Sequence, residues 1–137
     1  DVSPRVGRLY CGATRDIRFV QGNAQNIAAS NPEAFDLVVM SDVLHHVPVA
    51  DRKDLLKAIR TALAPEGTFV FKDWEKSRSP IHWLCYASDR WLTGDRVSYL
   101  SRDEMREMLM RCFGDTAIVA EARIRPWRNN IAAAIRR

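Results

Sequence analysis

The amino-acid sequence predicts an α/β protein with a doubly wound, mostly parallel sheet and a C-terminal antiparallel hairpin. Residues 35–40 and 68–71 form two nearly continuous apolar runs, a pattern typical of strands covered on both faces. Between them, residues 48–63 carry leucine and isoleucine at the spacing of one helix face. We expect this helix to end in the Ala-Pro-Glu-Gly segment at 64–67. A strand, a helix and a second strand in this order indicate a parallel pair with a right-handed crossover.

The sequence before this unit indicates one helix and one short strand. Ser3 followed by Pro4 is typical of a helix start, and we expect that helix to reach about residue 11. Residues 17–20 are rich in strand-forming side chains and are followed by a Gln-Gly-Asn turn.

The sequence after this unit predicts two helices and a hairpin. Residues 81–92 form an aromatic helix, closed by a Thr-Gly pair. The Ser-Arg-Asp-Glu segment at 101–104 matches a capping box, so we expect a helix from there to about residue 113. Residues 116–123 and 130–135 are predicted strands around a Pro-Trp turn, close enough to pair as an antiparallel hairpin at a sheet edge.

Composition indicates one globular domain over residues 1–137. Of these residues, 47% are hydrophobic and 28% charged, and no run approaches the roughly 18 apolar residues of a membrane helix. The three cysteines lie far apart, as expected of reduced thiols in a cytoplasmic protein. The net charge of +4 arises from five arginines within residues 123–137. The basic charge is therefore local, and the sequence predicts neither a nucleic-acid nor a membrane partner.

Polar clusters follow the predicted strands at the ends where ligands of open α/β sheets bind. A carboxylate at residue 1 can accept both hydroxyl hydrogens of a ribose. The amide at residue 23 can bond an adenine edge, and its small neighbours leave room for the ring. The candidate cofactor-binding residues are Asp1, Val2, Gly22, Asn23, Ala24, Ser41 and Asp42.

The candidate proton acceptors are His45, His46 and Asp73, which follow the apolar runs at 35–40 and 68–71. Adjacent histidines point in different directions, so the pair is not expected to form a metal site. One ring can line an active site while the other packs. For these residues, a packed core histidine and a solvated strand-end carboxylate are the alternative interpretations.

Four segments within residues 1–74 together resemble one enzyme family. The segment from Phe35 through Ser41, Asp42, His45 and His46 to Val47 closely resembles the fourth-strand segment of class I S-adenosylmethionine-dependent methyltransferases. Residues 63–70 resemble the helix end and fifth strand of that family. Residues 20–24 are similar to its adenine-contacting turn, with Asn23 where aspartate is commoner, and Asp1 is similar to its ribose-binding acid. The resemblance implies a Rossmann-like fold and S-adenosyl-L-methionine as the cofactor.

The sequence departs from that family at its start. The family binds the methionine end of the cofactor on a glycine-rich loop after the first strand, and residues 1–137 contain no such loop. We therefore expect the first, central strand to be missing from this chain and the natural gene product to carry a further N-terminal segment. As a fragment, the chain is expected to bind cofactor weakly or not at all.

The resemblance implies in-line transfer of the sulfonium methyl group to a small-molecule acceptor, aligned in a dry pocket. His45, His46 or Asp73 would deprotonate a hydroxyl or amine, while a carbon or thiol acceptor stays open. We interpret residues 77–100 as a helical, lid-like insertion. The candidate substrate-pocket residues are Trp83, Tyr86 and Trp91.

Other interpretations of the same residues stay open at this stage. The aromatic side chains can belong to a helix that simply packs on the sheet. A ribose-binding acid suits an NAD(P)-dependent oxidoreductase equally. A methyltransferase-like module without catalysis, whose basic hairpin binds a partner, also fits the pattern.

Overall fold

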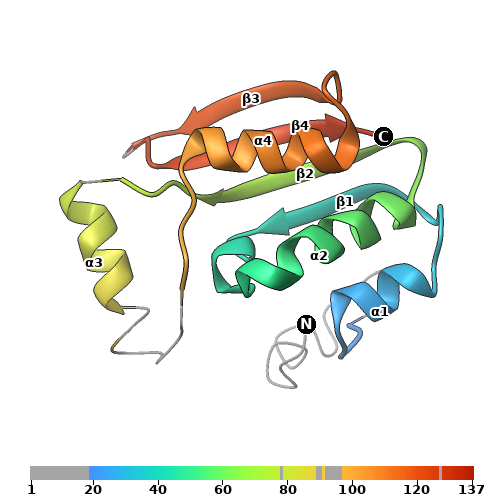
Figure 1. The fold of residues 1–137 in the computed structure, drawn as a ribbon, viewed down its shortest axis with the longest axis horizontal. Coiled ribbons are helices and arrows are strands. Elements are labelled where there is room, and N and C mark those ends of the chain that lie inside the picture. Colours follow the sequence, from blue (N-terminus) through green and yellow to red (C-terminus); the bar gives the residue numbers. More distant parts are fainter. Residues whose placement is uncertain (1–18, 78, 89–90, 92–96, 127) are drawn as a thin grey trace.

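The computed structural model describes residues 19–77, 79–88, 91, 97–126 and 128–137. Within them the strands form one mixed sheet in the order β1-β2-β4-β3, and helices α2 and α4 cover one of its faces (Figure 1). The elements are α1 (Ala24–Ala29), β1 (Phe35–Ser41), η2 (Leu44–His46), α2 (Val49–Ala62), β2 (Leu63–Trp74), α3 (Pro80–Ser88), α4 (Arg102–Phe113), β3 (Ile118–Ile124) and β4 (Asn130–Arg136).

The strand pairing confirms the predicted combination of a parallel pair and an antiparallel hairpin. β1 and β2 are parallel and are connected through α2, with Ser41 opposite Lys72. β3 and β4 form the hairpin, and β4 also pairs antiparallel with β2. Because β1 and β2 run in the same direction, their carboxyl ends lie at the same edge of the sheet, and α3 lies beyond that edge (Figure 1).

The core lies between the sheet and the two helices α2 and α4. Alternate residues of β2, including Phe69 and Phe71, are fully buried on this face, as are Leu56 of α2 and Leu109 of α4. The ring of Phe69 stacks on that of Phe113 with 5.5 Å between centroids. Burial of these large side chains supplies the main driving force for the fold.

Burial of β1 differs from the prediction. We expected a strand covered on both faces, yet Leu37 is 57% and Val39 61% exposed. The reason is the strand order, which places β1 at the edge of the described sheet with helices on one face alone. An apolar run shows that a strand can be buried but does not identify its neighbours.

The central helix ends within one residue of its predicted end, whereas the strand after it begins earlier than predicted. α2 ends at Ala62, and β2 begins directly with Leu63. Residues 64–67 form an irregular start of β2, since the register moves from Phe35 opposite Leu63 to Leu37 opposite Thr68. A Cβ at Gly67 would lie 2.8 Å from the Ala64 carbonyl oxygen, so only glycine fits this bend.

Other boundaries shift or lie outside the described residues. Phe19 and Val20 belong to no strand, in contrast to the prediction for residues 17–20. α3 spans Pro80–Ser88 and confirms the start of the aromatic helix, while residues 89, 90 and 92 of the predicted span lie outside the described residues. The helix predicted from Ser3, residues 17 and 18 and the Thr-Gly pair at 93 and 94 lie outside the described residues. No helix in the described part of the chain is both long and apolar enough to cross a membrane.

The capping box at the start of α4 is confirmed and generates a stability prediction. Ser101 Oγ accepts a hydrogen bond from the Glu104 backbone N–H, and the Glu104 carboxylate accepts one from the Ser101 N–H at 2.7 Å. The backbone and side-chain hydrogen bonds from Ser101 hold the pKa of Glu104 below its usual value of 4.5.

Ser101→Ala is expected to lower the free energy of unfolding by about 1 kcal/mol at pH 7, measured by urea denaturation. A depressed pKa stabilises the fold above the usual carboxyl pKa, and this contribution disappears as the pH falls through the folded-state value. The difference between wild type and variant should therefore narrow in acid. Ser30→Ala, at the exposed end of α1, is the control. Equal stability of Ser101→Ala and wild type at pH 7 would contradict the prediction.

Candidate functional site

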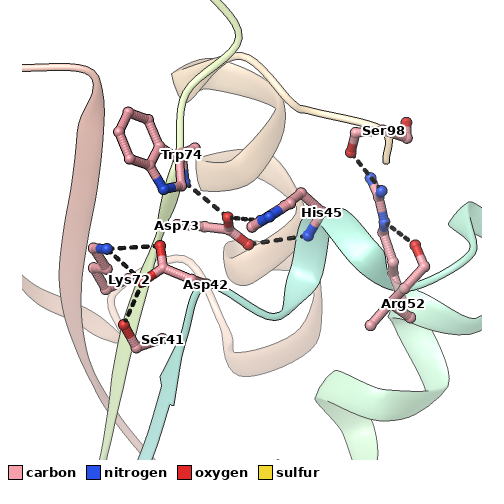
Figure 2. A network of polar contacts seen from close by, with 9 residues as sticks. Ser41, Asp42, His45, Arg52, Lys72, Asp73, Trp74 and Ser98 are labelled. Atoms are coloured by element: carbon pink, nitrogen blue, oxygen red, sulfur yellow. Dashed lines mark hydrogen bonds and ion pairs between the residues drawn. The ribbon is translucent and has the colours of Figure 1, made fainter. Parts of the chain in front are cut away.

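The Asp73 carboxylate lies at the carboxyl end of β2 and is only 2% exposed. Its Oδ2 accepts the backbone N–H of His45 at 3.1 Å, and its Oδ1 accepts the backbone N–H of Trp74 at 2.7 Å. Oδ1 also bonds Nδ1 of the His45 ring (Figure 2). The buried charge is thus held by three N–H groups, which fix its orientation and connect β2 to the turn after β1.

His45 is held on several sides. Its Nδ1 bonds the Asp73 carboxylate, its ring stacks on Tyr99 with 5.0 Å between centroids, and the His46 ring lies 4.1 Å away. A carboxylate partner places the hydrogen of a neutral imidazole on Nδ1 and leaves the lone pair on Nε2. The Asp73 bond and the two ring contacts thus orient the His45 side chain, which is only 5% exposed. His46 is exposed, so the two adjacent histidines face different surroundings, as predicted from their adjacency.

Asp42 and Lys72 form a second charged pair at the same sheet edge. Lys72 Nζ lies 2.6 Å and 2.5 Å from the two carboxylate oxygens of Asp42, and Ser41 Oγ donates to Oδ2 at 3.0 Å (Figure 2). Asp42 adopts a φ of 57°, in the left-handed region that Asp tolerates better than most residues. Ser41 thus bonds the Asp42 carboxylate, and the Lys72 ammonium neutralises its charge. Lys72 was not predicted, because its role follows from the β1–β2 register.

The candidate adenine turn forms the start of α1. Asn23 caps this helix, with its Oδ1 accepting the Gln25 N–H at 2.8 Å. A Cβ at Gly22 would meet only the Ile27 side chain, at 3.6 Å, so the turn is open on that side. The cap uses Oδ1 alone, and the amide NH2 of Asn23 remains a donor suited to an adenine nitrogen. Asp1 and Val2 lie outside the described residues.

Arg52 is a site residue that the sequence reasoning missed. It is almost fully buried, and it donates from Nε to the Val47 carbonyl at 2.9 Å and from Nη2 to the Ser98 carbonyl at 2.6 Å. Burial lowers the pKa of its guanidinium, and the nearby Asp73 acts in the opposite direction. The available signal was its position three and four residues before Leu55 and Leu56, on the buried face of α2.

Arg52 and His45 together hold the segment that returns from α3. Ser98 N–H donates to the His45 carbonyl at 2.9 Å, next to the Arg52 bond to the Ser98 carbonyl. Lys76 N–H donates to the Leu100 carbonyl at 2.8 Å. The stretch between residues 77 and 100 is thereby held at both ends, next to the His45–Asp73 pair, which we call the dyad.

The candidate substrate-pocket residues are brought together only in part. Trp83 and Tyr86 meet edge to face, with 6.5 Å between ring centroids, and both line a groove of about 580 Å³. Trp91 is 81% exposed and does not line this groove. In the described part of the chain, no three His, Cys, Asp or Glu side chains are grouped to hold a metal ion.

Comparison with protein families shows which family contains this chain. The methyltransferase domain family matches residues 1–112 of the chain. The chain belongs to this family. The recognition of the methyltransferase segments from sequence is therefore confirmed. Comparison with curated protein sequences finds no match.

Solved structures show the same fold as this methyltransferase domain. An S-adenosylmethionine-dependent methyltransferase from Mesorhizobium loti is 17% identical with a TM-score of 0.73, over 100% of this chain and 78% of that one. The Burkholderia thailandensis 1,6-didemethyltoxoflavin-N1-methyltransferase, with bound 1,6-didemethyltoxoflavin and S-adenosylhomocysteine, is 17% identical with a TM-score of 0.72. That match covers 98% of this chain and 56% of the Burkholderia enzyme, so the chain spans little more than half its length.

A third structure extends the likeness to a eukaryotic enzyme. Human N-acetylserotonin methyltransferase, in complex with S-adenosylmethionine, is 17% identical with a TM-score of 0.69, over 97% of this chain and 37% of that one. These structures confirm the predicted class I, Rossmann-like fold.

Arg52→Ala is expected to lower the free energy of unfolding by about 3 kcal/mol, measured by urea denaturation, because the Val47 and Ser98 carbonyls lose their buried donor. The control is Arg111→Ala on α4, whose exposed pair with Glu107 contributes at most about 0.5 kcal/mol. Equal effects of the two substitutions would show that the buried arginine does not hold this segment.

Proposed function

We propose that this methyltransferase domain takes part in methyl transfer from S-adenosylmethionine to a small-molecule acceptor, with His45 as the proton acceptor. The observation that carries the proposal is the His45–Asp73 pair, which lies at the carboxyl ends of β1 and β2 in a chain of this family. Ligands of open α/β sheets bind at this edge.

The described residues fit an adenosine-containing cofactor. The NH2 group of Asn23 lies at an open turn, and Ser41 and Asp42 lie at the end of the neighbouring strand. Asp1 and Val2 complete the proposed set as the ribose-binding end. When bound, S-adenosylmethionine supplies a methyl group on a sulfonium sulfur, which needs no further activation.

His45 is the residue we assign to the acceptor proton. Bound S-adenosylmethionine would give up its methyl group as the carbon–sulfur bond breaks and would leave as the thioether S-adenosylhomocysteine. The Nε2 lone pair of His45 would take the proton that a hydroxyl or amine of the acceptor loses. The Asp73 carboxylate then stabilises the resulting imidazolium. We assign Asp73 a positioning role, because its oxygens already accept three N–H groups. His46, which is exposed beside the dyad, is the second candidate acceptor.

The stretch 77–100 is proposed to close over the acceptor as a lid within a single domain that includes residues 1–137. Support comes from the anchoring of its ends at Lys76 and Ser98 and from the contact of Tyr99 with His45. Trp83 and Tyr86 would form apolar walls, and Trp91 would join them on closure.

Cofactor binding tests this proposal directly. Titration calorimetry with S-adenosylmethionine, S-adenosylhomocysteine and NAD⁺ should be carried out on the chain and on the full gene product. We expect saturable binding of the first two ligands by the gene product and none of NAD⁺. A folded gene product that binds neither methyltransferase ligand would overturn the proposal and favour a non-catalytic module.

Asp73→Asn is expected to lower kcat by about 100-fold while the Kd for S-adenosylmethionine stays within about twofold of wild type, because His45 loses its orienting carboxylate. The measurement is S-adenosylhomocysteine formed with an accepted substrate. Asp103→Asn, an isosteric change in the exposed first turn of α4, is the control. His45→Gln should be inactive and partly rescued by added imidazole. Full activity of either site variant would remove the dyad from the mechanism.

A further inference from the structure

The size and the lining residues of the groove beside α3 indicate the kind of ligand that it can accept. It is lined by Lys76, Ser77, His82, Trp83 and Tyr86, and we call it the α3 groove. Its volume of about 580 Å³ falls within the range of small-molecule sites. The sequence reasoning had pointed to its two aromatic residues but not to the three polar ones.

The apolar walls of the α3 groove suit a planar ring. Trp83 is 68% and Tyr86 41% exposed, so both rings offer surface to a ligand. The ring planes of Trp83 and Tyr86 meet at 74°, so the groove is lined by aromatic rings in two orientations. Aromatic surfaces in such geometry pack on flat, unsaturated ligands by stacking and edge-to-face contact.

The polar side of the α3 groove is positive. Among the described residues no carboxylate lines it, and the first turn of α3 contains no acidic residue. Within the described residues, Lys76 forms no ion pair, whereas Lys72 is bound by the Asp42 carboxylate. Glu104 lies near enough to interact electrostatically with Lys76, but its carboxylate is already bound to Ser101. Within the described residues, no carboxylate therefore holds the Lys76 ammonium away from the groove.

His82 adds a neutral donor to this lining. Its Nδ1 is buried and has no hydrogen-bond partner in the described structure. A buried lone pair costs less than a buried, unpaired N–H, so the ring hydrogen belongs on Nε2. Burial, and secondarily the charge of Lys76, lower the pKa of His82 and keep the ring neutral. With its hydrogen on Nε2, His82 donates to a ligand acceptor group.

The α3 groove is connected to the dyad through Tyr99. The Tyr99 ring stacks on His45 and also meets the His82 ring edge to face, with 4.8 Å between centroids. Two ring contacts thus join the proposed proton acceptor to a residue of the groove.

From these observations we infer that the α3 groove binds the acceptor as a planar aromatic anion. Its ring packs on Trp83 and Tyr86, and its carboxylate or equivalent acidic group binds Lys76 with a hydrogen bond from His82. The role of this ligand as methyl acceptor rests on the proposed function, whereas its binding does not.

The test compares two ligands of the same shape that differ in charge. Binding of 6-hydroxy-2-naphthoate and of the neutral 6-hydroxy-2-naphthamide is measured by calorimetry on the full gene product, without cofactor, at two salt concentrations. We expect the carboxylate to bind about fivefold more tightly, with the difference decreasing at high salt. Lys76→Gln should abolish the difference in affinity between the two ligands, and Lys76→Arg should retain it. Lys53→Gln, on the exposed side of α2, is the matched control. Trp83→Ala should lower the affinity for both ligands by about tenfold.

The outcomes separate this inference from the proposed function. S-adenosylmethionine is titrated into the same samples. If it binds while neither naphthalene ligand does, or while both bind equally and independently of Lys76, the anionic acceptor is overturned and the cofactor assignment stands. If the naphthoate binds through Lys76 while S-adenosylmethionine does not, the groove is supported and the proposed function fails.

Discussion

The site depends on a buried carboxylate that is satisfied by N–H groups. An ionised side chain as buried as Asp73 is costly unless every oxygen is hydrogen-bonded. The donors come from Trp74 on the same strand and from both the backbone and the ring of His45. The ends of β1 and β2 are consequently joined by one side chain, and the His45 ring takes its direction from the same bonds. Tyr99 stacks on the His45 ring, and the Ser98 N–H donates to the His45 carbonyl, so both contacts depend on the position of His45.

Strand geometry explains why two acids at one sheet edge have different surroundings. Successive residues of a strand point to opposite faces, so Lys72 and Asp73 lie on opposite sides of β2. Asp73 points to the face covered by α2 and α4 and is enclosed, whereas Lys72 points to the other face and meets Asp42. The Asp73 carboxylate is thus buried and holds the His45 ring, while the Asp42 carboxylate is paired with Lys72 and more exposed. The His45–Asp73 pair and the Asp42–Lys72 pair therefore lie on separate faces of the same sheet edge.

Much of this architecture could be predicted because it rests on local patterns. The capping box at Ser101, the α2 periodicity and the hairpin around Pro126 each depend on residues close together in the sequence. The exposure of Leu37 and Val39 could not be predicted, because it depends on which strands lie beside β1. The role of Lys72 depends on the register between β1 and β2. The role of Arg52 depends on its hydrogen bond to Ser98, 46 residues further along the chain. The two histidines and Asp73 were candidates because they follow the apolar strands at the ends where ligands bind, but the pairing of His45 with Asp73 depends on the fold.

The placement of Arg52 shows how the site balances charge without disturbing the dyad. Arg52 and Asp73 line the same narrow space, and the carboxylate favours the charged guanidinium at that separation. The arginine nevertheless gives its hydrogen bonds to the neutral carbonyls of Val47 and Ser98. A direct Arg–Asp bond would occupy the carboxylate oxygens and deprive His45 of the acceptor that sets its tautomer. The Asp73 charge thus offsets part of the cost of burying the guanidinium, while the carboxylate oxygens stay bound to the imidazole and to two backbone N–H groups. The same arginine bonds anchor the return segment, so the charge balance of the dyad and the position of the stretch from α3 are coupled.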